Sequence, residues 1–90
     1  MYSLTTTTQF EKDYKLCKKR GYKMELLNSI FLLLEEKGAL PAKFKPHKLT
    51  GNYKGFWECH IQPDWLLIWF QKDATKTIAL TRTGTHSDLF

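Results

Sequence analysis

The sequence lacks a hydrophobic run long enough to cross a membrane. Its longest apolar stretch, residues 30–34, is far shorter than the roughly 20 residues that span a bilayer. The first nine residues also lack the basic and apolar regions of a signal peptide and contain a run of threonines instead. We therefore expect no membrane association, and we expect a cytoplasmic protein.

Cysteine is scarce, and no repeat, low-complexity tract or linker interrupts the chain. The two cysteines, Cys17 and Cys59, form no CxxC pair and are too few for a disulfide-stapled secreted domain. We expect both to be reduced and packed inside. The 90 residues, 42% hydrophobic and 14% aromatic, predict one globular domain over residues 1–90, which excludes multidomain enzymes and intrinsic disorder.

The net charge of +5 is concentrated in the first part of the chain. Residues 1–54 hold 11 Lys/Arg against 5 Asp/Glu, whereas residues 55–90 hold 3 against 4. Residues 41–54, named here the basic loop, contain no acidic residue and four lysines: Lys43, Lys45, Lys48 and Lys54. This segment is expected to attract a polyanion such as nucleic acid or an acidic protein partner. A solvated lysine-rich loop without a partner is the alternative.

The spacing of apolar residues indicates a strand and two amphipathic helices before the basic loop. Residues 2–7 form a β-branched run typical of a strand. Helical spacing predicts a helix from Thr8, where Thr8 and Glu11 fit a capping box, to Gly21. A second helix is predicted from Met24 to Gly38. Because so few residues separate the two helices, they are expected to form an antiparallel hairpin.

Three strand-like runs follow the basic loop, at residues 55–61, 65–70 and 76–82, with turns at 62–64 and 72–74. They predict an antiparallel meander. The helices have to cover one of its faces, because such small amphipathic helices have no other place to bury their apolar stripe. The expected fold class is α+β: an N-terminal strand and an antiparallel helix hairpin packed on a small, mainly antiparallel sheet.

Polar side chains gather at one end of the predicted meander. The end of one antiparallel strand lies beside the start of the next, which brings together His60, Asp64 and Arg82. His86 follows Arg82 by four residues and belongs to the same neighbourhood. Strand alternation places Glu58 on the same face as His60. Asp64 is expected about 5 Å from His60 across the turn, where it would hold one tautomer of the imidazole for acid–base catalysis.

Each of these residues also has a structural explanation. A single histidine on a strand is usually a hydrogen-bonded edge residue, and Arg82 suits a surface ion pair. Their convergence beside a basic loop that contains His47 favours a functional site. Three histidines also suggest zinc, but there is no HxxxH or CxxC pair and Asp64 would have to complete the ligand set. We expect neither a metal nor another cofactor.

Aromatic residues accompany this polar cluster. Most tryptophan and phenylalanine residues of the three strands alternate as core residues do. Tyr53, Trp65 and Phe90 are expected to flank the cluster instead, where they are candidates for stacking on an RNA base. Phe90 equally fits a C-terminal packing anchor.

Three segments resemble one toxin family in order, spacing and placement. They are residues 45–56 (KPHKLTGNYKGF), residues 58–65 (ECHIQPDW) and residues 82–90 (RTGTHSDLF). They resemble the YafQ branch of the RelE/ParE toxin superfamily, and the likeness extends over nearly the whole chain. One position departs from the family's pattern: Trp57 stands where relatives commonly carry arginine, which implies one phosphate contact fewer.

The resemblance implies a bacterial toxin of a type II toxin-antitoxin pair, an endoribonuclease that cleaves messenger RNA, in many relatives on the ribosome. It also implies a cognate antitoxin. The toxin is expected to contact operator DNA only through this antitoxin. The family's functional positions fall on His47, His60, Asp64, Arg82, His86 and Phe90, with Trp65 beside them and Lys43, Lys45, Lys48 and Lys54 as RNA contacts.

The expected reaction needs no metal. The ribose 2′-hydroxyl attacks the adjacent phosphate, so a base removes its proton, a cation stabilises the phosphorane and an acid protonates the leaving 5′-oxygen. We expect His60, oriented by Asp64, to be the base, and His86 to be the acid. Arg82 is the expected phosphate clamp. The reverse assignment of the two histidines is compatible with the sequence, as is replacement of one of them by His47 or Glu58.

Two other functions fit the same scaffold. A ParE-like poison of DNA gyrase would not need the histidines. A non-catalytic module that binds RNA or protein would need only the basic loop and the aromatic residues. The three histidines, placed with Asp64 and Arg82, favour catalysis.

Overall fold

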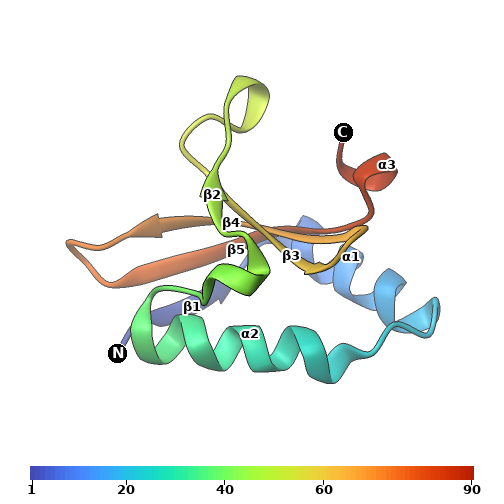
Figure 1. The fold of residues 1–90 in the computed structure, drawn as a ribbon, viewed down its shortest axis with the longest axis horizontal. Helices are drawn as coiled ribbons and strands as arrows, with labels where there is room; N and C mark the ends of the chain where they lie inside the picture. Colours follow the sequence, from blue (N-terminus) through green and yellow to red (C-terminus); the bar gives the residue numbers. More distant parts are fainter.

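The computed structural model describes residues 1–90 and contains a five-stranded sheet with two long helices (Figure 1). In chain order the elements are β1 (Ser3–Thr6), α1 (Thr8–Lys19), α2 (Met24–Lys37), the 3₁₀ helix η1 (Ala42–Phe44), β2 (His47–Lys48), the 3₁₀ helix η2 (Gly51–Tyr53), β3 (Trp57–Gln62), β4 (Trp65–Lys72), β5 (Thr77–Gly84) and α3 (His86–Leu89). The strand order is β1-β5-β4-β3-β2, and only β1 and β5 pair in parallel. The predicted α+β fold is confirmed.

Both long helices begin and end close to their predicted limits. The Thr7 hydroxyl caps α1 by accepting a hydrogen bond from the Phe10 backbone N–H at 3.0 Å. The capping box predicted at Thr8 is therefore wrong by one residue, because Thr8 already lies inside the helix. α2 ends at Gly38, whose φ of 63° is a left-handed conformation that glycine adopts without strain. None of the helices has the length and hydrophobicity needed to cross a membrane.

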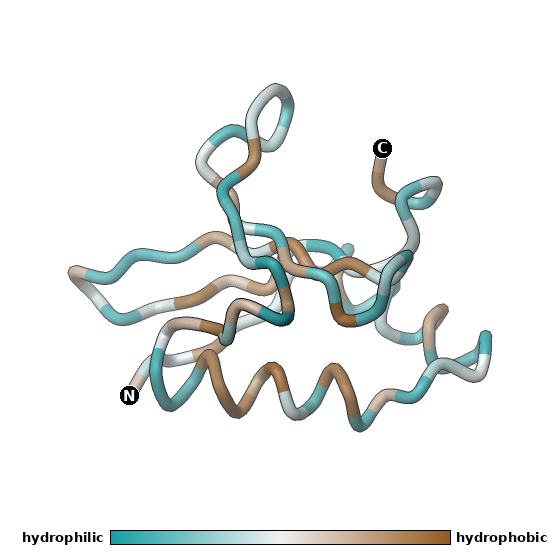
Figure 2. Tube along the Cα trace, in the orientation of Figure 1, coloured by the Kyte–Doolittle hydropathy of each residue, from teal (hydrophilic) through white to brown (hydrophobic).

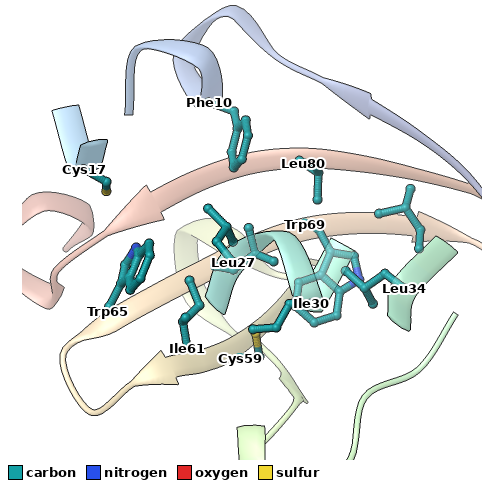
Figure 3. Close-up of a cluster of buried hydrophobic side chains, with 12 residues drawn as sticks. Phe10, Cys17, Leu27, Ile30, Leu34, Cys59, Ile61, Trp65, Trp69 and Leu80 are labelled. Carbon is teal, nitrogen blue, oxygen red and sulfur yellow. The ribbon is translucent and has the colours of Figure 1, made fainter. Parts of the chain in front are cut away.

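The main core lies between the two long helices and the sheet (Figure 3). It consists of Phe10, Cys17, Leu27, Ile30, Leu34, Cys59, Ile61, Trp65, Leu67, Trp69, Ile78 and Leu80. Hydrophobic positions recur along α2 for this reason (Figure 2). The ring centroids of Phe10 and Phe31 are 6.1 Å apart, and the Tyr14 hydroxyl lies 3.5 Å from the Asn28 side chain, so the helices run antiparallel as predicted. Both cysteines are free and buried.

The opposite face of the sheet carries a smaller apolar cluster. It contains Leu66, Ile68 and Leu89, with Leu49, Tyr53 and Phe56 packed against them. The segment with β2 and η2 and the helix α3 project from this face, away from α2 (Figure 1). The cluster therefore brings the basic loop and the C-terminal tail to the same side of the sheet.

The short helix α3 is fixed from two directions. Thr85 and Asp88 form a capping box by exchanging hydrogen bonds between their side chains and backbone N–H groups. Arg20, just after α1, donates to both carboxylate oxygens of Asp88, at 2.6 and 3.1 Å. A side chain at Gly84 would meet the Asp88 carboxylate at 2.8 Å, so glycine is needed where β5 leads into α3. His86, the first residue of α3, is placed by these contacts.

Candidate active site

Three histidines from three elements form a row on the side of the sheet opposite the long helices. His47 lies on β2, His60 on β3 and His86 at the start of α3. The ring centroids of His47 and His60 are 6.4 Å apart, and those of His60 and His86 are 5.9 Å apart. The structure thus brings together the three histidines that the sequence predicts to converge, with His60 in the middle. We call them the histidine row.

Asp64 binds His86 and not His60, which corrects the expectation from the sequence. Its Oδ1 accepts hydrogen bonds from the His86 backbone N–H at 2.9 Å and from the ring Nδ1–H at 2.6 Å. The expected pair with His60 does not form because His60 pairs with Leu66, and a register shift follows before the turn. The His86 N–H groups, the backbone one first, hold the pKa of Asp64 below its usual value. The ionised carboxylate thus orients the ring and leaves Nε2 of His86 free.

His60 has a neutral partner. Its Nδ1 lies 3.3 Å from the carbonyl oxygen of Pro63. Because a carbonyl oxygen only accepts, Nδ1 carries the hydrogen, and Nε2 of the neutral ring keeps its lone pair. His60 also lines an open hollow of about 430 Å³ together with Lys43 and Lys45. A proton acceptor therefore lies beside two cations of the basic loop.

His47 is held between two acceptors. Its Nδ1 donates to the carbonyl oxygen of Lys45 at 2.8 Å, and its Nε2 lies 3.2 Å from Oε1 of Glu58, the residue opposite it on β3. Both contacts are satisfied together when both ring nitrogens carry protons. Glu58 is buried, and its Oε2 has no hydrogen-bond partner. Glu58 and the Lys45 carbonyl together hold the His47 ring in place.

Arg82, the phosphate clamp expected from the sequence, is anchored by an ion pair with Asp13. Its Nε and Nη2 donate to the Asp13 carboxylate at 2.7 and 3.3 Å, and its Nη1 lies 3.5 Å from the Tyr53 hydroxyl. β1 pairs with β5 only as far as Leu80, so the edge of β5 beyond that residue is open to α1. Asp13 raises the pKa of Arg82. With 23% of its side chain exposed, the guanidinium presents only its outer edge to a ligand.

Asp13 is the site residue that the sequence analysis missed. It is only 8% exposed, and it also accepts hydrogen bonds from the Gln9 side chain at 3.0 Å and from the Thr83 backbone N–H at 3.2 Å. The available signal was its place on the apolar stripe of α1, three residues after Phe10 and four before Cys17. An acidic residue at an inward helical position indicates a buried partner.

Trp65 lines the same hollow as Asp64, but it belongs to the core, so it lacks the exposed ring that the expected base stacking needs. It is 2% exposed, and its indole N–H donates to the Thr83 hydroxyl at 3.0 Å. The strand pleat directs its side chain toward the long helices, where no RNA base can stack on it. Trp57 lies parallel to Trp69, with 10° between the ring planes.

Phe90 and Tyr53 do lie beside each other at the surface. Phe90 is 64% exposed, and its ring centroid is 5.6 Å from that of Tyr53 in an edge-on arrangement. The anchoring role considered for Phe90 belongs to its neighbour Leu89, which is buried in the smaller cluster. Phe90 is thus available to a ligand.

The four lysines of the basic loop are exposed, and none of them forms a salt bridge. The Lys43 ammonium lies 5.1 Å from the ring centroid of Phe44, and the Lys48 ammonium lies 5.7 Å from that of Trp57. These charges are free to meet a polyanion.

The architecture recurs among bacterial toxins of type II toxin-antitoxin systems. Residues 2–90 match the family described as the bacterial toxin of type II toxin-antitoxin system, YafQ. The chain belongs to the YafQ toxin family.

Individual relatives agree with this assignment. The chain is 42% identical over 83 residues to the mRNA interferase toxin YafQ of Escherichia coli K12, which covers 91% of this chain and 88% of the relative. The crystal structure of the E. coli DinJ-YafQ complex matches with a TM-score of 0.90 and 38% identity, over 100% of this chain and 99% of the other. A metal-bound toxin from Helicobacter pylori matches with a TM-score of 0.89 and 39% identity, over 100% of both chains. In the present chain, no three His, Cys, Asp or Glu side chains are grouped to hold one metal ion.

Proposed function

We propose that residues 1–90 act as one endoribonuclease domain, an mRNA interferase that cleaves messenger RNA on the ribosome in the cytoplasm. The observation that carries the proposal is the histidine row, in which His60 and His86 each leave Nε2 free beside a basic loop. The name of the E. coli relative, an mRNA interferase, points the same way. A gyrase poison or a simple binding module has no need of two oriented imidazoles.

The two free nitrogens suit the two proton transfers of the reaction. Nε2 of His60 removes the proton of the ribose 2′-hydroxyl, whose oxygen bonds to the adjacent phosphorus. The bond between phosphorus and the 5′-oxygen breaks, and Nε2 of His86 protonates that oxygen. His60 suits the base because its partner is a neutral carbonyl, and His86 suits the acid because the ionised Asp64 carboxylate accepts its Nδ1–H and leaves Nε2 free to donate a proton. The products are a 2′,3′-cyclic phosphate and a 5′-hydroxyl.

Two cations stabilise the charge that develops on the phosphorane. We assign one cation to the protonated form of His47, which Glu58 holds at one end of the row, and the other to Arg82, which presents its outer edge beside Tyr53. Fixed donors of this kind are typically worth about 10²–10³-fold in rate. Lys43, Lys45, Lys48 and Lys54 contact the RNA backbone, and Phe90 stacks on a base. No metal or cofactor takes part.

The proposal is tested by incubating the purified protein with labelled RNA, with and without ribosomes, in the presence of EDTA. We expect cleavage that resists the chelator and becomes faster on ribosome-bound RNA. His60→Ala and His86→Ala should abolish cleavage while the far-UV circular dichroism stays unchanged, since neither side chain belongs to an apolar cluster. Full activity in both folded variants, or no cleavage by the unaltered protein, would contradict the proposal.

An antitoxin partner follows from the family and from the structure of the DinJ-YafQ complex. We propose that an acidic or amphipathic antitoxin segment covers the basic loop, where it blocks the RNA path. Affinity for the antitoxin should fall with added salt and with the combined neutralisation of Lys45, Lys48 and Lys54. A complex that is insensitive to both changes would place the antitoxin elsewhere.

A further inference from the structure

A second open hollow adjoins the site on the side away from the basic loop. It has a volume of about 370 Å³, and Tyr22 and Asp64 are among its lining residues. This hollow and the hollow beside His60 share Gln62, the last residue of β3, and Pro63, the first residue of the β3–β4 turn. The two hollows therefore meet at this turn. His60 lines one of them and Asp64 lines the other.

Asp64 is the only charged residue that lines the second hollow, but the chain segment that carries Tyr22 is basic. Tyr22 follows a cationic run at the end of α1 and precedes α2, and the cations of this region are Lys18, Lys19, Arg20 and Lys23. No acidic residue occurs between Asp13 and Glu25. Arg20 is paired with Asp88, whereas the three lysines are exposed and form no salt bridge. Figure 2 shows the connection between the helices as hydrophilic.

Tyr22 has a fixed position in this hollow. Its ring packs edge-on against buried Trp65, with the centroids 4.9 Å apart and 66° between the planes, while the residue itself is only partly buried. An aromatic ring held in the wall of a hollow, on a chain segment rich in unpaired lysines, is a combination that suits single-stranded nucleic acid. The base stacks on the ring, and the phosphates meet the cations.

The position of the second hollow favours RNA over an acidic protein segment. A strand that is cleaved at the histidine row has to continue on both sides of the scissile phosphate. The basic loop serves one side, through the hollow beside His60. The other side leads past the β3–β4 turn and Asp64 into the hollow at Tyr22.

We propose that the RNA crosses the Gln62–Pro63 turn and that Tyr22, Lys19 and Lys23 form a second RNA-binding surface for the nucleotides beyond the scissile phosphate. This proposal rests on the proposed ribonuclease function and extends it. Tyr22 stacks on a base, and the two lysines contact the backbone.

The test measures affinity for single-stranded RNAs that carry one 2′-deoxynucleotide at the cleavage position and extend to one side of it or to the other. Lys19→Gln with Lys23→Gln should weaken binding several-fold and lower the salt slope by about 0.7 for each lost phosphate contact. This loss of affinity should occur only for RNAs that extend from the cleavage position toward the hollow at Tyr22, and not for RNAs that extend toward the basic loop. Lys37→Gln with Lys72→Gln is the matched control, since it removes the same charge from the end of α2 and the end of β4.

Tyr22 is tested separately by two substitutions. Tyr22→Phe should keep the affinity, because the stacking ring remains, whereas Tyr22→Leu should lose about tenfold. The melting temperature of each variant shows whether the packing on Trp65 survives.

Three results would decide against the proposal. They are equal salt slopes for the two lysine pairs, equal losses on RNAs extended to either side, and weakened antitoxin binding with unchanged RNA binding. Cleavage of unmodified RNA by the unaltered protein is measured in parallel. If that cleavage occurs while the lysine pairs behave alike, the second surface is wrong and the ribonuclease function stands. If no cleavage occurs, the proposed function itself fails.

Discussion

At the scale of single residues, the site depends on which nitrogen each imidazole leaves free. Pro63 and Asp64 bind Nδ1 of His60 and His86, respectively, so both rings present Nε2. His47 differs, because both of its nitrogens face protein acceptors. The three histidines are therefore not equivalent, and only two of them are free to exchange a proton with RNA.

The contact between Asp64 and His86 can be tested by Asp64→Asn. The neutral amide no longer provides the charged acceptor that orients the imidazole of His86, so the single-turnover cleavage rate should fall by about 10²–10⁴-fold while RNA affinity changes little. Asp73→Asn is the control, since Asp73 is also an exposed carboxylate with a lowered pKa, caused by Gln71 and Tyr2, but lies in the β4–β5 turn. Equal rates in the two variants would remove Asp64 from the mechanism.

The sequence predicts which residues lie together at the site better than it predicts the hydrogen-bond partner of each one. Strand alternation and strand order suffice to gather His60, Asp64 and His86 at one end of the sheet. The partner of Asp64 is decided by a register shift of β3 against β4 between His60 and Gln62. The hydrophobic pattern of the sequence does not indicate this shift. The sequence does not indicate the face of Trp65 either, because β4 is apolar at every position from Trp65 to Phe70, so alternation alone assigns no side.

At the scale of elements, the strand β2 and the helix α3 carry two of the histidines, and both elements are very short. β2 has only two residues, and the His47–Glu58 contact fastens it to β3. α3 has four residues, and Arg20 fastens it to α1 through Asp88. Such short elements have little stability of their own, so these side-chain contacts keep the site assembled.

The contact between α1 and α3 can be tested by Asp88→Asn. Arg20, followed by the Thr85 N–H, holds the pKa of Asp88 well below its usual value. A carboxyl group whose pKa falls on folding stabilises the protein above its unfolded pKa, near 4, and loses this contribution as the pH drops below it. Asp88→Asn should therefore lower the melting temperature at pH 7, and the difference from the unaltered protein should shrink below about pH 4.

The control for this substitution is Glu36→Gln, which removes an exposed carboxylate from α2. Thermal unfolding at pH 7 and pH 3 is the measurement. A difference in melting temperature for Asp88→Asn that does not depend on pH would contradict the ion pair as its cause.

The contact between α1 and β5 predicts that Asp13 acts through Arg82. Arg82→Ala should bind RNA almost normally and cleave it about 10²–10³-fold more slowly. Asp13→Asn should also slow cleavage, because the guanidinium loses its anchor. In the Arg82→Ala background, however, the added Asp13→Asn should cost nothing further in rate, as measured by a double-mutant cycle on single-turnover rates. Additive losses would show that Asp13 affects catalysis by another route.

The elements themselves follow from the sequence more closely than the contacts between them. The glycine stop at Gly38 and the spacing of apolar residues set α2 almost to the residue. α3 is the exception, because it has only one apolar anchor, Leu89, and is stabilised by Arg20 from a distant part of the chain. Local patterns carry no information about such a contact.

At the scale of the whole molecule, the two faces of the sheet have different tasks. The face with α1 and α2 buries the main core, while the other face holds a small apolar cluster with the histidine row and the basic loop beside it. The net charge of +5 resides largely in exposed lysines that no acidic residue neutralises. Affinity and chemistry are therefore supplied by different residues.

This separation predicts distinct kinetic effects. Lys45→Gln with Lys54→Gln should weaken RNA binding and lower the salt slope by about 0.7 per lost contact, while kcat stays nearly unchanged. Titrations at several salt concentrations and single-turnover rates on the same RNA are the measurements, with Lys37→Gln and Lys72→Gln as the control pair. A loss of kcat at saturating RNA would place a loop lysine in the chemistry.

The central claim is that the histidine row activates the ribose 2′-hydroxyl as the nucleophile. It is tested most directly by comparing cleavage of an RNA with that of the same RNA carrying a single 2′-deoxynucleotide at the cleaved position, followed by analysis of the product ends. We predict that the deoxy substitution blocks cleavage at that bond and that the normal products carry a 2′,3′-cyclic phosphate and a 5′-hydroxyl. Cleavage of the deoxy-substituted bond, with a 5′-phosphate on the product, would contradict this mechanism.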